Sequence, residues 1–382
     1  MKTFAMYCGS IVLLVSILLV GCSKQPDAYK IGVITPLTGS RATYGAATKQ
    51  GVDLAFERIN KAGGIDGKKV EAIYEDSRGE PKDAGYALQK LINVDRVPVI
   101  LGAFRSAETQ AIAGTAESRK VVLFSASSTA DEIKYVGDYI FRNVPTNSDQ
   151  GKTAAHFVLE YLQKKTAAVL YQNDDYGKSL GEAFIENFSN IGGKILAQET
   201  FEGGQKDFRH ALTKIKQMRP EVVFFPGNYE ECALILKQAR QLGIQVPFVG
   251  GDGAYSPDLF GIAGSAANGS YYTLMAMGYG VSDEEVANFL DGFKKAYGGE
   301  PDVYAAYAYD AILVIADAIK RGGYTSDGIK DALYKLEFKG VTGITKFDSY
   351  GEVSKPYYLY EAKDGKFALV TWVPTGSVTA TR

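Results

Sequence analysis

The chain has 382 residues, of which 46% are hydrophobic and 23% charged, a composition typical of a folded globular protein and unlike that of a disordered chain. The net charge is −2 and no basic tract occurs, so we expect no nucleic-acid partner. The length exceeds that of one average core and favours two domains. The two histidines, His156 and His210, both fall in predicted helices. We therefore expect no metal site, no cofactor and no Ser-His-Asp triad, which argues against an enzyme.

The N-terminus predicts export. Lys2 precedes an apolar run at residues 11–20, too short for a comfortable membrane span and suited to a signal peptide. The run ends in Leu19-Val20-Gly21-Cys22, which resembles a bacterial lipobox. We expect residues 1–21 to be removed, Cys22 to be lipidated and residues 22–28 to form a tether. The alternatives are a plain secretory signal or a short membrane anchor.

The predicted localisation is the periplasm or the cell surface, with the lipid on Cys22 as the membrane anchor. Cys8 leaves with the signal, so Cys232 would be the one cysteine of the mature chain that is free to pair. No intramolecular disulfide is expected.

Short β-branched and aromatic runs alternate with helical patterns along the rest of the chain. Strands are predicted at 30–34, 70–74, 99–101, 121–124, 167–171, 195–199, 222–225 and 248–249. Helices are predicted around 52–59 and at 82–94, 107–118, 148–163, 178–190, 207–217, 230–242, 283–297, 304–321 and 326–336. This alternation predicts an α/β fold with parallel sheets and helices on both faces.

Three loops that follow predicted strands carry candidate ligand-binding groups. Ser106 lies after the strand at 99–101, a run of hydroxyls ends at Thr129, and Asp252 lies among glycines after the strand at 248–249. Purely structural roles are also open: Ser106 as a helix N-cap, Thr129 in a capping box with Glu132, and Asp252 as a turn residue. Hydroxyls at helix starts suit a carboxylate, and one acidic side chain suits an ammonium group. Together the three loops predict a pocket for an amino acid.

Several motifs spread over the chain resemble the leucine/isoleucine/valine-binding protein family, the type I periplasmic binding proteins of branched-chain amino acid ABC importers. The resemblance covers nearly all of residues 29–372. The motifs are Ile31-Gly32-Val33-Ile34-Thr35-Pro36-Leu37-Thr38-Gly39, Ile59-Asn60-Lys61-Ala62-Gly63-Gly64-Ile65-Asp66-Gly67, Asp174-Asp175-Tyr176-Gly177, Gly203-Gly204-Gln205-Lys206-Asp207-Phe208 and Tyr307-Ala308-Tyr309-Asp310-Ala311.

The resemblance implies two Rossmann-like lobes joined by three crossovers, with the ligand in the cleft between them. Lobe 1 would comprise 29–146 and 278–354, and lobe 2 would comprise 147–277 and 355–373, followed by a tail at 374–382. The implied ligand-binding residues fall into three groups. Ser106, Ser127 and Thr129 would bind the α-carboxylate, Asp252 the ammonium group, and Tyr44, Tyr176 and Tyr304 would supply aromatic cleft walls.

Two positions depart from the family pattern. Asn228 stands where leucine-binding members have a tyrosine, so either Tyr229 takes over that role or this part of the pocket differs. Arg105 could pair with a second carboxylate on a ligand, although we expect it at the solvated rim of the cleft.

The predicted function is an extracytoplasmic binding lipoprotein, expected to be a monomer. It would capture a branched-chain or other aliphatic or hydrophobic amino acid and deliver it to an ABC permease and ATPase complex. The alternatives are a receptor of the same fold for amides, urea-like solutes or aromatic carboxylates, and a sensor subunit.

Overall fold

The computed structural model describes residues 28–278 and 282–370. The predicted signal peptide, Cys22 and the tether up to residue 27 lie outside the described residues, as does the tail from residue 371. Within the described ranges, no helix combines the length and the apolar character needed to cross a membrane.

The first lobe is built on a five-stranded sheet with strand order β2-β1-β3-β4-β5. All its pairings are parallel. The strands are β1 (Ala28–Thr35), β2 (Lys69–Asp76), β3 (Val99–Leu101), β4 (Val122–Ser125) and β5 (Ile140–Arg142). Residues 99–101 and 122–125 are buried throughout, as expected for central strands covered on both faces.

The second lobe is built on a seven-stranded sheet with strand order β14-β13-β10-β9-β8-β6-β7. Its strands are β6 (Thr166–Gln172), β7 (Lys194–Phe201), β8 (Val222–Phe224), β9 (Phe248–Gly250), β10 (Ser270–Met275), β13 (Tyr357–Lys363) and β14 (Lys366–Val370). Strands β10, β13 and β14 pair antiparallel, so one edge departs from the parallel arrangement. A small hairpin, β11 (Phe338–Gly340) with β12 (Gly343–Thr345), belongs to neither sheet.

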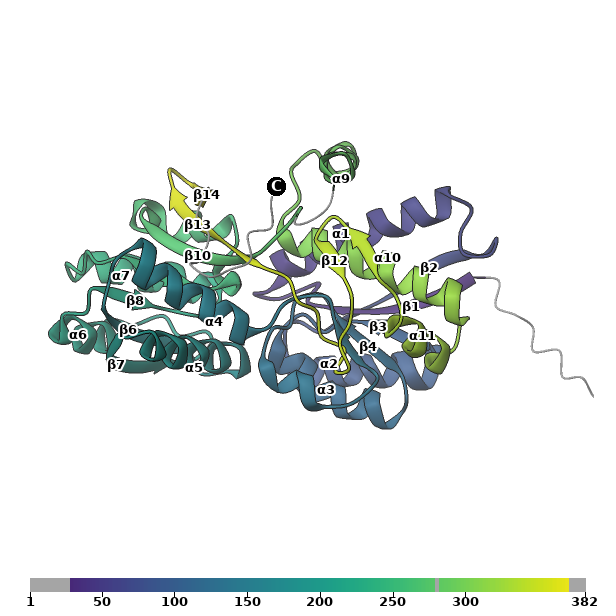
Figure 1. Cartoon of the computed structure of the whole chain (residues 1–382), viewed down its shortest axis with the longest axis horizontal. Coiled ribbons are helices and arrows are strands. Elements are labelled where there is room, and N and C mark those ends of the chain that lie inside the picture. The colour runs from purple at the N-terminus through teal and green to yellow at the C-terminus, as the bar shows by residue number, and fades with distance from the viewer. Residues whose placement is uncertain (1–27, 279–281, 371–382) are drawn as a thin grey trace, which may run out of the picture.

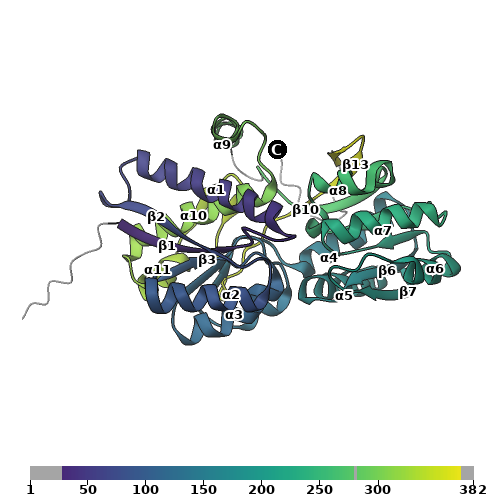
Figure 2. The same ribbon diagram turned by 180° about the vertical axis from the view of Figure 1, so that it is seen from behind.

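Helices cover both faces of each sheet (Figure 1, Figure 2). The first lobe carries α1 (Ala42–Lys61), α2 (Pro81–Lys90), α3 (Ser106–Ser118), α9 (Asp283–Tyr297), α10 (Val303–Gly322) and α11 (Ser326–Leu333). The second carries α4 (Asn147–His156), α5 (Asp175–Asn190), α6 (Arg209–Met218), α7 (Tyr229–Gln241) and α8 (Asp258–Ala263). Single π or 3-10 turns lie at Leu91–Asp95, Asp131–Tyr135, Phe157–Tyr161, Asp252–Ala254 and Gly264–Ala267. The predicted α/β class with helices on both faces is confirmed.

Helices α1 and α10 pack closely because glycine lets their backbones approach. A Cβ atom on Gly51 would lie 2.0 Å from the carbonyl oxygen of Ala305. Helix α10 is buried along most of its length, and Tyr304 in its first turn hydrogen-bonds the carbonyl of Asp252 in the second lobe. This packing places Tyr44 of α1 and Tyr304 of α10 side by side, with ring centroids 5.4 Å apart.

The chain passes between the lobes three times: between β5 and α4, between β10 and α9, and between β12 and β13. The two lobes therefore stand beside one another in Figure 1, joined near the middle of the molecule. The carboxyl ends of β3, β4, β6, β8 and β9 all lead into loops at this junction, which is where open α/β sheets bind ligands.

Candidate functional site

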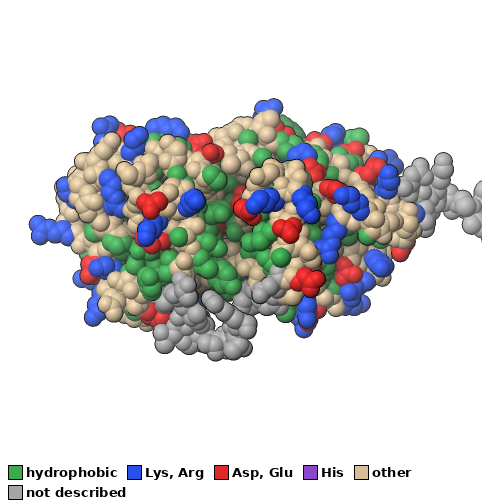
Figure 3. Space-filling model, turned by 90° about the horizontal axis from the view of Figure 1, so that it is seen from above, with side chains coloured by type: hydrophobic (Ala, Val, Ile, Leu, Met, Phe, Trp, Pro, Cys, Tyr) green, Lys and Arg blue, Asp and Glu red, His purple; other side chains and the backbone are tan. Residues whose placement is uncertain are grey.

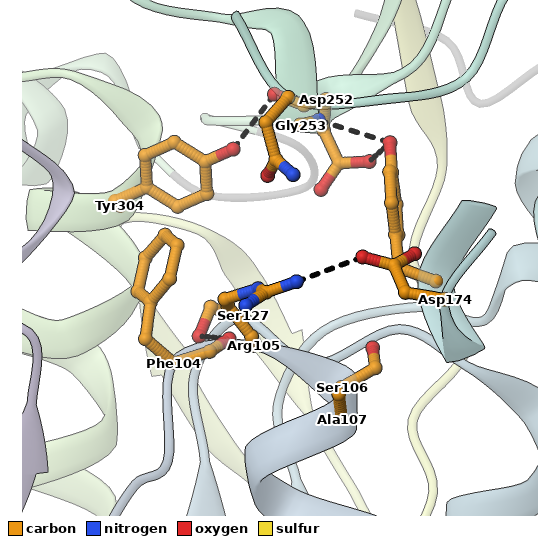
Figure 4. Close-up of a pocket in the computed structure, with 11 residues that line it drawn as sticks. Phe104, Arg105, Ser106, Ala107, Ser127, Asp174, Asp252, Gly253 and Tyr304 are labelled. Carbon is orange, nitrogen blue, oxygen red and sulfur yellow. Dashed lines mark hydrogen bonds and ion pairs between the residues drawn. The ribbon is translucent and has the colours of Figure 1, made fainter. Parts of the chain in front are cut away.

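A small cavity lies where the two lobes meet. In the view of Figure 3, hydrophobic side chains gather along this junction. Residues from both lobes line the cavity: Phe104, Arg105, Ser106, Ala107, Ser127, Asp174, Tyr176, Asn228, Asp252, Gly253 and Tyr304 (Figure 4).

The first-lobe side of the cavity is formed by the start of α3 and by the hydroxyl loop after β4. Arg105 has extended backbone and precedes the helix, and Ser106 is its first residue. The Ser106 hydroxyl oxygen accepts hydrogen bonds from the backbone N–H groups of Thr129 and Ala130, each at 3.2 Å. Ser106 therefore ties the two loops together and does not act as the N-cap of α3.

Thr129 lies behind this lining, fully buried. Its hydroxyl has no hydrogen-bond partner among the described residues, so the capping box with Glu132 that the sequence left open does not form. The Ser127 hydroxyl instead donates to the carbonyl of Phe104 at 2.7 Å and faces the cavity. A buried hydroxyl without a partner is costly, which makes Thr129 a candidate hydrogen-bonding group for a ligand after a small loop movement.

The second-lobe side of the cavity carries one buried carboxylate, Asp252. Gln150 Nε2 and the Tyr176 hydroxyl both donate to its Oδ1, at 2.8 Å and 3.0 Å. Burial raises the pKa of Asp252 to about 6, although these two hydrogen bonds oppose the shift. The backbone N–H groups of Asp252 and Gly253 also hydrogen-bond the carboxylate and favour its ionised form. Asp252 lines the cavity, where an ionised carboxylate suits a cationic group.

This raised pKa gives a testable pH dependence. Because the folded pKa of about 6 exceeds the ordinary value of 3.8, ionisation of Asp252 costs stability as the pH rises through this interval. Without added amino acid, Asp252→Asn is expected to be more stable than the wild type at pH 8 by up to about 3 kcal/mol. The difference should disappear below about pH 4. Thermal and urea unfolding at pH 4, 6 and 8 measure it; a stability difference that does not change with pH would contradict the expectation.

Two tyrosines of the first lobe hold the loop that carries Asp252. The Tyr304 hydroxyl donates to the carbonyl of Asp252 at 2.7 Å, and the Tyr44 hydroxyl donates to the carbonyl of Gly253 at 2.5 Å. Tyr304 lines the cavity, whereas Tyr44 is buried behind it and stacks on Phe104 at 4.9 Å. These tyrosines are therefore wall residues and also links between the lobes.

Arg105 does not lie at a solvated rim, as the sequence led us to expect. Its side chain is 16% exposed, lines the cavity and forms an ion pair with Asp174, with Nη2 2.9 Å from Oδ2. Its Nη1 donates to the carbonyl of Gly79 at 2.7 Å. Figure 4 shows the guanidinium group reaching across the cavity toward Asp174. The expectation was wrong because the partner of Arg105 is Asp174, which belongs to the other lobe and lies 69 positions away in the sequence. No local pattern indicates this pair.

Asn228 lines the cavity, and Tyr229 does not. Tyr229 is the first residue of α7 and points toward α1, where its ring packs against Tyr44 with centroids 5.4 Å apart. Its hydroxyl donates to the carbonyl of Ser40 at 3.3 Å. Of the two possibilities left open, the structure favours a pocket that differs at Asn228.

Six of the eight predicted site residues line the cavity: Ser106, Ser127, Tyr176, Asn228, Asp252 and Tyr304. Tyr44 and Thr129 lie directly behind it. Sequence reasoning did not assign Phe104, Asp174 or Gly253 to the site. Asp174 had a usable signal, since it lies in a quoted motif after β6 and its side chain caps α5 through the N–H of Gly177. Within the described residues, no cluster of three or more His, Cys, Asp or Glu side chains could hold a metal ion.

Comparison with known proteins places this chain in a family. The profile of the periplasmic binding protein family matches residues 28–366. A leucine-, isoleucine-, valine-, threonine-, and alanine-binding protein from Pseudomonas aeruginosa is 31% identical over 342 residues, which are 89% of this chain and 91% of the relative. This chain belongs to the leucine/isoleucine/valine-binding protein family. The resemblance found in the sequence motifs is confirmed, and the relatives are solute-binding proteins, not enzymes.

Solved structures agree with this family in sequence and in shape. A leucine binding protein from Thermotoga maritima is 31% identical, with a TM-score of 0.85 over 90% of this chain and 98% of its own. A branched-chain amino acid transporter substrate binding protein from Streptococcus pneumoniae, solved with isoleucine, is 35% identical. Its TM-score is 0.84, over 90% of this chain and 99% of its own. A solute binding protein from R. palustris solved with benzoate is 21% identical and shares the fold.

Proposed function

We propose that this protein captures an amino acid between its two lobes and delivers it to an ABC importer. The single observation that carries the proposal is the pairing of unlike polar groups across one small cavity. Ser106 at the start of α3 and Ser127 on the loop after β4 line it from one lobe, and the buried carboxylate of Asp252 lines it from the other. A zwitterion satisfies both ends at once.

In this proposal the α-carboxylate binds at Ser106, Ser127 and Thr129, and the Ser127 hydroxyl turns from the carbonyl of Phe104 to the ligand. The ammonium group binds Asp252 beside Tyr176. Family members named for leucine, isoleucine and valine support a branched-chain or other aliphatic amino acid as the first candidate. Because the ligand contacts both lobes, its binding favours the closed arrangement. The permease would then recognise that arrangement.

The export signal completes the proposal. Lipidation at Cys22 would anchor a monomer at the periplasmic membrane face or cell surface, and residues 22–28 would tether it near its permease and ATPase. The proposed lobe boundaries are 29–146 with 278–354, and 147–277 with 355–373. Metabolic labelling with a palmitate analogue tests the anchor, since Cys22→Ala should abolish incorporation.

A thermal-shift screen followed by calorimetry tests the binding function. On the chain starting at Ser23, we expect at least one of the twenty amino acids to raise the melting temperature, because a ligand that binds only the folded state stabilises it. Benzoate, acetamide and urea serve as comparison solutes. Binding of one of these with no response to any amino acid would overturn the proposal in favour of an amide or aromatic-acid receptor.

A further inference from the structure

Part of the cavity lining is polar and is not used by the carboxylate and ammonium groups of the proposed amino acid ligand. Ser106 and Ser127 account for the carboxylate end, and Asp252 accounts for the ammonium end. The lining that is left includes the aromatic rings of Phe104 and Tyr304 and a polar network. This network comprises Arg105, Asp174, Gln172 and Asn228, and all but Gln172 line the cavity.

The hydrogen bonds of the polar network fix the direction of each side chain. Asp174 accepts at Oδ2 from Arg105 Nη2 at 2.9 Å and from Gln172 Nε2 at 2.6 Å. Its Oδ1 accepts from the N–H of Gly177 at 2.8 Å. Because an ionised carboxylate only accepts, Gln172 must present its amide nitrogen to Asp174 and its oxygen to the opposite side.

The orientation of the Gln172 amide determines the orientation of the Asn228 side chain. Gln172 Oε1 accepts from Asn228 Nδ2 at 2.7 Å and from the Asn228 backbone N–H at 3.3 Å. The amide nitrogen of Asn228 is therefore held by Gln172, which is 1% exposed. This leaves Oδ1 of Asn228, a hydrogen-bond acceptor, for the cavity that the residue lines.

Arg105 supplies the complementary donors. Its hydrogen bonds to the carbonyl of Gly79 and the carboxylate of Asp174 use part of a guanidinium group that has five N–H donors. The remaining donors and Oδ1 of Asn228 match a neutral ligand group that both accepts and donates. An acidic side chain would be placed beside Asp174, whose charge already balances Arg105.

We propose that the polar network is a side-chain subsite that favours amino acids carrying a neutral hydroxyl or carboxamide over aliphatic amino acids of the same shape. An aliphatic side chain would cover Arg105 and Asn228 without hydrogen-bonding them, and unmatched buried polar groups give the strongest discrimination between similar ligands. This inference rests on the proposed function and departs from it at one point. The names of the relatives favour an aliphatic side chain, whereas the lining of this cavity favours a polar one.

Matched ligand pairs test the subsite by calorimetry on the chain starting at Ser23. Threonine against valine and asparagine against leucine have similar shapes and differ in hydrogen bonding. We expect the wild type to bind the polar member at least about tenfold more tightly in one of the two pairs. In Asn228→Leu and in Arg105→Met this ratio should fall to about one or reverse, while Arg119→Met, an exposed arginine, should keep it.

The outcomes separate this inference from the proposed function. If no amino acid binds, the proposed function fails. If amino acids bind and the aliphatic member is equal or stronger in both pairs, the subsite alone is overturned. Tighter binding of aspartate or glutamate than of asparagine or glutamine would overturn the neutral class. An equal loss for every ligand in both variants would assign these residues to closure or to the shared carboxylate.

Discussion

Replacing Asp252 by alanine is expected to lower the affinity for the amino acid ligand by about 30-fold or more. The carboxylate is 3% exposed and is held at Oδ1 by Gln150 and Tyr176. Removing one partner of a desolvated charge pair costs roughly 2–5 kcal/mol, since the ligand ammonium would then be buried without its counter-charge. A loss of 2 kcal/mol corresponds to about 30-fold in the dissociation constant. Isothermal titration calorimetry with the best ligand of the screen measures it.

Two further variants distinguish the loss of the Asp252 charge from a loss of folding. Asp252→Asn keeps an oxygen that can accept from Gln150 and Tyr176, so it should fold and still lose affinity. Asp207→Ala removes an exposed carboxylate paired with Arg209 in the same lobe and should bind like the wild type. Affinities of leucine, alanine and glutamate that remain unchanged in Asp252→Ala would remove Asp252 from the site.

Local sequence pattern predicted the parallel core of the fold well and its antiparallel edge poorly. Short buried runs such as residues 99–101 and 222–224 are apolar throughout, so the chain itself marks them as strands. Residues 357–363 mix buried, half-buried and exposed positions and carry tyrosines and charges. They become a strand through pairing with β10, more than 80 positions earlier, and no local signal encodes that partner.

The candidate site shows the same division between local and distant information. Ser106, Ser127 and Asp252 follow strands, so they are expected at the carboxyl ends of the strands, where α/β sheets bind ligands. The direction of Arg105 depends on Asp174 in the other lobe, and the exclusion of Tyr229 depends on Tyr44 of α1. Contacts of this kind form only when the two lobes pack against each other. The sequence pattern therefore predicts which residues lie near the cavity, but not which of them face it.

Arg142 is the clearest case of a residue that the sequence pattern passed over, and replacing it by methionine is expected to destabilise the fold by roughly 3–5 kcal/mol. Its side chain is fully buried at the end of β5. Nε donates to both carboxylate oxygens of Glu352, at 2.9 Å and 2.7 Å. Glu352 lies on the chain segment between β12 and β13, and β5 leads into the first passage between the lobes. Without Arg142 this buried carboxylate loses its partner.

Arg142 also supports the ligand side of the first lobe. Its Nη1 donates to the carbonyls of Ser128 and Ala130, at 3.2 Å and 2.7 Å, and so holds the loop that carries Thr129. Unfolding in urea measures the loss of stability in Arg142→Met.

The double variant Arg142→Met with Glu352→Leu provides the decisive comparison. It should recover part of the lost stability, because the unpaired carboxylate is gone and two apolar side chains can pack in its place. The double variant should nevertheless bind the amino acid more weakly than the wild type, since nothing replaces the hydrogen bonds to the loop. Recovery of stability together with full affinity would show that Arg142 supports only the fold. No recovery at all would show that the carboxylate of Glu352 is not what makes the loss of Arg142 costly.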